Sequence, residues 1–258
     1  MRAPLSVLIS GASSGIGAAL ALAYAQEGIR LALGGRDAAR LEAVAERCRA
    51  VGAQVSATRV DVTDRAATAV WIGAADADLV IANAGISAGT GGEGESDAQV
   101  RRIFAVNVDG VFNTLHPAIE TLRARTPAAD GRRGQIAIMA SLAGFRGFAG
   151  APAYCASKAA VKVYGEALRP DLAAEGIGLS VICPGYVRSA MTAANDFPMP
   201  LLMDAGRAAE IIKRGLARNA ARIAFPWPMY WAAWLCGALP PSWLDATMRR
   251  LPRKTGAI

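Results

Sequence analysis

Three residues in the second half of the chain could together move a proton to or from a bound oxygen atom. Tyr154 and Lys158 are four positions apart, which makes them neighbours on one face of a helix. A phenol with a pKa of about 10 is a slow acid–base group at neutral pH, and a nearby ammonium lowers that pKa. Ser141 follows the apolar run 136–140, where its hydroxyl can polarise an oxygen atom. A Tyr-x-x-x-Lys pair also occurs by chance in many helices, so the other motifs in the chain must show whether this pair is catalytic.

A glycine-rich segment near the N-terminus has the composition of a phosphate-binding turn. It follows a strand-like run and opens a helix-like one. Glycines at this spacing permit a tight turn, a close approach of the backbone to a pyrophosphate, and close packing of the helix on the strand. A plain turn is the alternative, and the strand–turn–helix context favours phosphate binding. The expected binding residues are Gly11, Ser13, Ser14, Gly15, Ile16 and Gly17.

Short apolar runs alternate along the chain with longer segments of helical periodicity. Strands that alternate with helices build a parallel sheet covered on both faces. We therefore expect one α/β domain over residues 1–258, with a doubly wound parallel sheet and ligands beyond the carboxyl ends of its strands. The predicted strands are 5–10, 30–34, 54–60, 79–82, 134–140 and 178–183, and the predicted helices are 16–27, 38–51, 98–123 and 153–175.

Taken in order, these motifs resemble those of the short-chain dehydrogenase/reductase (SDR) family. The motifs are the GxxxGxG spacing, Asn83-Ala84-Gly85, Ser141, Tyr154-x-x-x-Lys158 and Pro184-Gly185. The resemblance covers residues 5 to about 192 and implies a Rossmann-type sheet of about seven strands. The last strand is expected at 223–225. One departure is Ala82, which stands where the family often has a further asparagine before Asn83.

The resemblance implies an oxidoreductase that interconverts a carbonyl and a secondary alcohol. Tyr154 would protonate the carbonyl oxygen as the nicotinamide delivers hydride to carbon, with the roles reversed in oxidation. Ser141 would orient that oxygen, and Lys158 would also bind the nicotinamide ribose. Asn107 matches the asparagine that supports a water relay to the lysine, although an asparagine within a helix can simply bond locally.

The resemblance also assigns cofactor contacts outside the glycine loop. Asp61 is expected to hydrogen-bond the adenine edge, although an aspartate after a strand is often a helix N-cap. The turn after the sixth strand would cover the nicotinamide, with Ser189 in place of the usual threonine. The cofactor-binding residues implied in this way are Asp61, Val62, Asn83, Ala84, Gly85, Tyr154, Lys158, Pro184, Gly185, Val187 and Ser189.

The end of the second strand favours NADP(H) over NAD(H). NAD enzymes place a carboxylate here for the ribose 2′-hydroxyl, whereas NADP enzymes need a cation for the 2′-phosphate. Counted from Gly11 as in the family that the chain resembles, the carboxylate position falls on Gly35, and Arg36 follows, with a charge and forked geometry that suit phosphate. Asp37 is the rival, because it could serve the 2′-hydroxyl, but it also occupies a natural N-cap site before the helical run.

Residues 189–206 occupy the place of the family's substrate lid. They are apolar and rich in methionine, which predicts a mostly hydrophobic pocket for a small molecule. The alternative is that these side chains pack the lid without facing substrate. The expected substrate contacts are Leu142, Phe148, Tyr186 and Met191.

The composition excludes several other kinds of site. The net charge is +7, but the basic residues are scattered and no aromatic residues interleave with them, so no nucleic-acid partner is expected. Four widely spaced cysteines and the lone His116 imply neither a metal site nor a disulfide framework. Reduced thiols and an N-terminus without a signal peptide favour a cytoplasmic protein. A homo-oligomer, either a dimer or a tetramer, is expected.

Residues 225–258 form a hydrophobic and basic extension that belongs to no regular strand–helix unit. Prolines leave about eleven uninterrupted residues, which is too short for a membrane span. A membrane-surface anchor is an alternative, because tryptophans precede several cations. Packing over the substrate pocket or against another subunit is favoured, and it predicts shielded tryptophans. The residues concerned are Trp227, Trp231, Trp234 and Trp243, followed by Arg249, Arg250, Arg253 and Lys254.

Two functions compete with a carbonyl reductase or alcohol dehydrogenase for a hydrophobic small molecule. One is a nucleotide-sensing binding protein that retains the fold without the chemistry. The complete set of Ser141, Tyr154 and Lys158 argues against it, because a sensor needs no acid–base group. The other is a peripheral-membrane reductase that modifies lipids, which elaborates the leading function and depends on the C-terminal extension.

Overall fold

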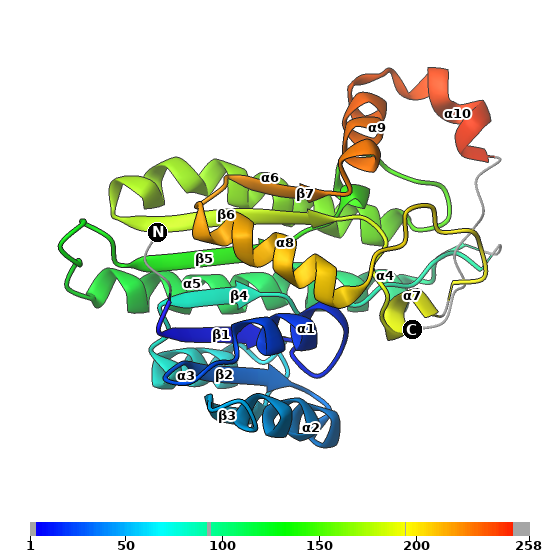
Figure 1. The fold of residues 1–258 in the computed structure, drawn as a ribbon. Helices are drawn as coiled ribbons and strands as arrows, with labels where there is room; N and C mark the ends of the chain where they lie inside the picture. The colour runs from blue at the N-terminus through cyan, green and yellow to red at the C-terminus, as the bar shows by residue number, and fades with distance from the viewer. Residues whose placement is uncertain (1–3, 92–93, 194, 250–258) are drawn as a thin grey trace.

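One parallel sheet of seven strands forms the centre of the protein, in the order β3-β2-β1-β4-β5-β6-β7 (Figure 1). The computed structural model describes residues 4–91, 94–193 and 195–249. The strands are β1 (Ser6–Ser10), β2 (Arg30–Gly35), β3 (Gln54–Arg59), β4 (Leu79–Ala82), β5 (Gly134–Met139), β6 (Ile177–Pro184) and β7 (Arg222–Phe225). Because β1 pairs with both β2 and β4, the winding of the chain reverses there. The predicted doubly wound α/β fold is confirmed, including its last strand.

Helices cover both faces of the sheet. They are α1 (Gly15–Tyr24), α2 (Ala38–Arg49), α3 (Arg65–Ala75), α4 (Asp97–Phe104), α5 (Gly110–Ala124), α6 (Pro152–Ala174), α7 (Ala190–Ala193) and α8 (Ala205–Ala217). Successive strand residues point to opposite faces. Val7 and Ile9 of β1 therefore share a core cluster with buried residues of α1, α2 and α8, whereas Leu8 joins a second cluster with α3, α5 and α6.

Two helical regions differ from the sequence-based prediction. The helix expected over 98–123 is divided into α4 and α5 by a π-helical turn, Ala105–Asp109, which contains Asn107. Helices α3 and α8 were not among the predicted elements, although both carry local signals. Asp64 caps α3 by accepting a hydrogen bond from the Ala67 N–H at 3.0 Å, and Asp204 caps α8 in the same way.

The chain after β7 forms two further helices, α9 (Trp227–Ala238) and α10 (Pro241–Arg249). They stand out from the body beyond the end of β7 (Figure 1). Pro226 and Pro228 lie just before and within the first turn of α9, where a missing N–H costs no helical hydrogen bond, so they begin the helix rather than break it. Arg250, Arg253 and Lys254 lie outside the described residues. None of the helices in the described ranges is long and apolar enough to cross a membrane.

Candidate active site

The glycine-rich loop between β1 and α1 forms a cradle that larger residues would fill. Gly11 and Gly15 have φ angles of +67° and +56°, in the left-handed region that favours glycine. A Cβ atom on Gly17 would lie 2.2 Å from the Gly11 carbonyl oxygen. The Ser14 side chain makes no cap hydrogen bond with α1, which leaves the N–H groups of the first turn for a ligand. These features fit the phosphates of a dinucleotide cofactor.

Asn83, at the carboxyl end of β4, holds this loop in place. Its Nδ2 atom donates to the carbonyl oxygens of Ser10, at 2.9 Å, and Gly11, at 3.1 Å. The Ser10 hydroxyl oxygen in turn accepts from the backbone N–H groups of Asn83 and Ala84. Asn83 lines the cavity, as expected, but its amide N–H groups serve the cradle's backbone. Its observed role is therefore to join β4 to the glycine loop at the point where the winding reverses.

A cavity of about 1240 Å³ runs along the carboxyl ends of the strands from this cradle to α9. The sequence-predicted residues that line it are Gly11, Ser13, Ser14, Gly15, Ile16, Gly17, Arg36, Asp61, Val62, Asn83, Ala84, Gly85, Ser141, Leu142, Phe148, Tyr154, Lys158, Pro184, Gly185, Tyr186, Val187, Ser189 and Met191. Asn107 is the one predicted site residue that the cavity wall does not include.

Asp37, which follows β2, is the N-cap residue of α2, and both of its carboxylate oxygens are hydrogen-bonded there. Its Oδ1 atom accepts from the Arg40 N–H at 3.0 Å, and its Oδ2 atom pairs with Arg40 Nε at 2.6 Å. These hydrogen bonds hold the pKa of the Asp37 carboxyl below its usual range. The N-cap interpretation of Asp37 is confirmed. Arg36 is exposed at the cavity edge and joins none of the ion pairs found among the described residues.

Asp61 does not cap a helix, so that alternative is wrong. Its Oδ1 atom accepts from the Thr63 backbone N–H at 3.0 Å and from the Thr63 hydroxyl at 2.9 Å. The cap of α3 is Asp64 instead, because the helix begins only at Arg65. Asp61 thus shapes the turn after β3 and lines the cavity together with Val62.

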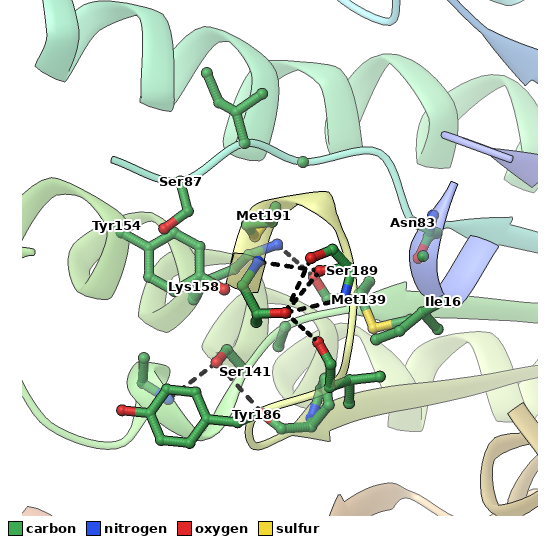
Figure 2. A pocket seen from close by; sticks show the side chains of 18 of the residues that line it. Ile16, Asn83, Ser87, Met139, Ser141, Tyr154, Lys158, Tyr186, Ser189 and Met191 are labelled. Carbon is green, nitrogen blue, oxygen red and sulfur yellow. Dashed lines mark hydrogen bonds between the residues drawn. The ribbon is translucent and has the colours of Figure 1, made fainter. Parts of the chain in front are cut away.

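The catalytic candidates meet where α6 passes the end of β5 (Figure 2). A hydrogen bond links the hydroxyl groups of Tyr154 and Ser141. Lys158 is only 3% exposed, and its Nζ atom donates to the Met139 carbonyl at 2.9 Å. The same Nζ atom lies 5.9 Å from the centre of the Tyr154 ring. The three side chains predicted from spacing therefore gather at one point of the cavity.

Burial controls the charges of this group. It raises the pKa of Tyr154 to about 12, against the smaller opposing effect of the hydrogen bond with Ser141. It lowers the pKa of Lys158 to about 8, because the ammonium is taken out of water. The expectation that the ammonium draws the phenol pKa downward is thus wrong for the protein by itself. Removal from water is the largest influence on each of the two pKa values.

Ser141 connects three parts of the site. It caps the 3-10 turn Leu142–Gly144 by accepting from the Ala143 N–H at 3.1 Å. It donates to the carbonyl oxygen of Pro184, at the end of β6, at 3.4 Å. With the bond to Tyr154, these contacts fix its hydroxyl between β5, β6 and α6, where a substrate oxygen would be oriented.

Asn107 is fully buried in the π-helical turn and bonds to distant segments. Its side chain accepts from the Ile86 N–H at 2.8 Å, and donates to the Ile86 carbonyl at 2.9 Å and to the Ser157 hydroxyl at 3.0 Å. The alternative of purely local bonding is therefore wrong. A Cβ atom on Gly85 would lie 3.3 Å from both Asn107 Oδ1 and Lys158 Nζ, so a glycine here lets both polar groups approach the same backbone.

The opposite end of the cavity is apolar. Leu142, Phe148, Tyr186 and Met191 lie there as predicted, and the Tyr186 and Phe197 rings meet edge to face at 6.1 Å. Among the described residues, the charged side chains of the lining are Arg36, Asp37, Arg40, Asp61, Arg102 and Lys158. The lining residues that were not predicted include four on α9, whose helical spacing is visible in the sequence: Met229, Ala232, Ala233 and Cys236.

The C-terminal extension covers the cavity with one face of α9 only. The inner face of α9 lines the cavity, which agrees with the expected packing over the pocket. The expected shielding of the tryptophans is wrong within one chain, because Trp227, Trp231, Trp234 and Trp243 are between 47% and 72% exposed. The reason is geometric: a helix that lines a cavity with one face turns its opposite face outward.

Comparisons with known proteins agree with this geometry. The family model for short chain dehydrogenases matches residues 6–197. A protein described as an uncharacterized oxidoreductase from Myxococcus xanthus is 39% identical over 251 residues, which cover 95% of this chain and 97% of the relative. A short-chain dehydrogenase from Sphingobium yanoikuyae, solved in complex with NADPH, is 27% identical with a TM-score of 0.78 and 98% of each chain covered. The chain belongs to the short-chain dehydrogenase family.

Proposed function

We propose that the protein is an NADP(H)-dependent oxidoreductase that interconverts a carbonyl and a secondary alcohol on a hydrophobic small molecule. The observation that carries the proposal is the hydrogen-bonded pair of Tyr154 and Ser141, with Lys158 beside it, in the cavity that also contains the glycine cradle. When bound, the nicotinamide cofactor supplies or accepts the hydride. Every other requirement of the reaction falls on side chains of this chain.

In this proposal Tyr154 is the general acid in reduction and the general base in oxidation. Its raised pKa keeps the phenol protonated at neutral pH, which suits delivery of a proton to a carbonyl oxygen. Ser141 orients that oxygen through its fixed hydroxyl. Lys158 places a cation beside the phenol and reaches the cofactor ribose. Asn107 acts as a positioning residue, because its bonds to Ile86 hold the chain that follows β4 next to Lys158.

The proposed substrate is apolar near its reacting carbon. Support comes from the walls of the cavity beyond Tyr154, where the lining residues of segment 189–206 and of α9 carry no charge. A pocket of this kind binds by burying apolar area and selects through a few polar groups. We expect turnover when apolar ketones with NADPH, or secondary alcohols with NADP⁺, are screened by the absorbance of the reduced nicotinamide. Tight NADPH binding with no turnover on any pair would favour the nucleotide-sensing alternative.

We expect the Arg36→Ala substitution to weaken NADPH binding selectively. Gly35 offers no carboxylate, Asp37 is occupied by its helix cap, and Arg36 remains available for a 2′-phosphate. A charge-assisted hydrogen bond contributes about 1.5–3 kcal/mol, and exposure places Arg36 near the lower end, so the NADPH dissociation constant should rise roughly tenfold. Titration of both cofactors by fluorescence measures this change.

The control for this substitution is Arg47→Ala, which removes the same charge from an exposed position on α2 outside the cavity lining. It should leave both dissociation constants unchanged. NADH affinity should also be the same in the Arg36→Ala variant as in the unmodified protein, because NADH has no 2′-phosphate. Equal affinity of the unmodified protein for NADPH and NADH would refute the assignment of Arg36.

A further inference from the structure

Helix α9 has two faces with different surroundings. Met229, Ala233 and Cys236 line the cavity from the inner face. On the outer face, Trp227, Trp231, Trp234 and Leu235 follow the spacing i, i+4, i+7 and i+8, which places them in one stripe. These four side chains are 72%, 54%, 47% and 55% exposed. We call this stripe the tryptophan face.

The inner face is anchored, so α9 cannot turn its tryptophans inward without losing contacts. The Arg222 guanidinium donates to the Tyr230 hydroxyl at 3.2 Å, and the rings of Phe145 and Tyr230 meet edge to face at 5.6 Å. Arg146 donates to the carbonyl oxygens of Cys236, at 3.2 Å, and Leu239, at 2.9 Å, which satisfies the end of the helix. The tryptophan face is therefore a fixed part of the outer surface.

The sequence around the tryptophan face is uncharged in α9 and ends in a segment whose charged residues are all cations. The whole of α9, WPMYWAAWLCGA, contains no charged residue, and the next helix adds Trp243, which is 71% exposed. After Asp245, the sequence contains no further acidic residue and four cations: Arg249, Arg250, Arg253 and Lys254. An uncharged aromatic stripe is thus followed along the chain by a purely cationic segment.

We propose that the tryptophan face docks on an anionic lipid surface. Tryptophan is enriched at membrane–water interfaces, because its ring is largely apolar while its N–H can still meet polar headgroups. Cations near such a surface are attracted to anionic lipids. Docking would bring the apolar end of the cavity close to the lipid, since α9 separates the two. The inference does not depend on the proposed reaction, because binding is measured without turnover.

A second copy of the chain fits the tryptophan face less well than a lipid surface does. Two-fold association brings the same patch of each partner together. Such association would also bring together two chains that each carry a net charge of +7. Anionic lipid offers the opposite charge to such a chain. Charge complementarity thus favours the lipid surface.

Sedimentation with vesicles tests the proposal. The full chain should sediment with mixed phosphatidylcholine–phosphatidylglycerol vesicles, sediment less with pure phosphatidylcholine, and be released by high salt. The triple variant Trp227→Gln, Trp231→Gln, Trp234→Gln should bind at least roughly tenfold more weakly, because the apolar area that enters the interface is lost. The control Val51→Gln, Val70→Gln removes exposed apolar side chains elsewhere and should bind like the unmodified protein.

Two results would overturn the proposal. In the first, the unmodified protein does not bind vesicles but self-associates in lipid-free buffer, as measured by light scattering, and the triple variant does not self-associate. That result would assign the tryptophan face to a second copy. The other is undiminished vesicle binding by the triple variant. Both comparisons require equal thermal stability and NADPH affinity in the variants, which separates loss of docking from loss of the fold.

Discussion

Replacing Tyr154 by phenylalanine is expected to lower turnover by roughly 10²- to 10⁴-fold while NADPH still binds, which is the range of general acid catalysis. The substitution keeps the ring and removes the hydroxyl that is hydrogen-bonded to Ser141. Ser141 retains its contacts with the Ala143 N–H and the Pro184 carbonyl, so the turn around it should persist. Steady-state rates on a substrate found by screening, with cofactor titration, measure both quantities.

Tyr186→Phe is the matched control, because it removes another hydroxyl from the same cavity. If proton delivery is specific to Tyr154, this variant should lose much less activity than Tyr154→Phe. Near-full activity of Tyr154→Phe would rule out the proposed acid–base role. A loss of cofactor affinity as large as the loss of rate would instead point to a damaged site, and thermal stability would identify that case.

The strands, the glycine cradle and the catalytic group could be predicted because their signals are local. An apolar run of four to eight residues identifies a buried strand, and the four-residue separation of Tyr154 and Lys158 fixes their relation on α6. The parallel sheet then brings residues as distant as Gly11 and Ser141 to one edge, because all its strands end there. For these residues, position in the fold follows from position along the chain.

The contacts of α9 and Asn107 could not be predicted, because they depend on which distant segments are packed together. The wall that Met229 and Cys236 contribute depends on the packing of α9 against the 3-10 turn after β5 and against β7. The partners of Asn107 are 21 and 50 residues away in the sequence. The prolines that interrupt the apolar run in this region are those that begin its helices.

The shift of the Tyr154 pKa was predicted in the wrong direction for a related reason. Spacing identifies the neighbour of Tyr154, which is Lys158, but it does not report how much water is removed from both side chains. Burial acts on each charged form separately and is the largest influence on both pKa values.

Replacing Lys158 by methionine is expected to reduce both turnover and cofactor affinity, because the ammonium is proposed to act on the phenol and on the ribose. We expect the rate to fall by roughly 10²-fold or more. Methionine keeps the length of the side chain without its charge, so the packing around α6 is disturbed little. If the Lys158→Met variant kept the turnover rate and the cofactor affinity of the unmodified protein, Lys158 would have no role in the reaction.

The Lys158→Met variant also tests a prediction about stability, and this test needs no substrate. Burial lowers the pKa of Lys158 from 10.5 to about 8, so charging it in the folded protein costs on the order of 3 kcal/mol. Between these two values the unfolded chain holds a proton that the folded chain has lost, and stability therefore rises with pH.

Urea unfolding of the cofactor-free protein should show the unmodified chain gaining stability relative to Lys158→Met from about pH 8 to about pH 10.5. Below about pH 8 the difference should stay constant, because both states of Lys158 are protonated, and the comparison between the two proteins cancels the titration of all other groups. A difference that is the same across the whole range would mean that Lys158 is solvated, with an ordinary pKa, and not held charged at a cost beside Tyr154.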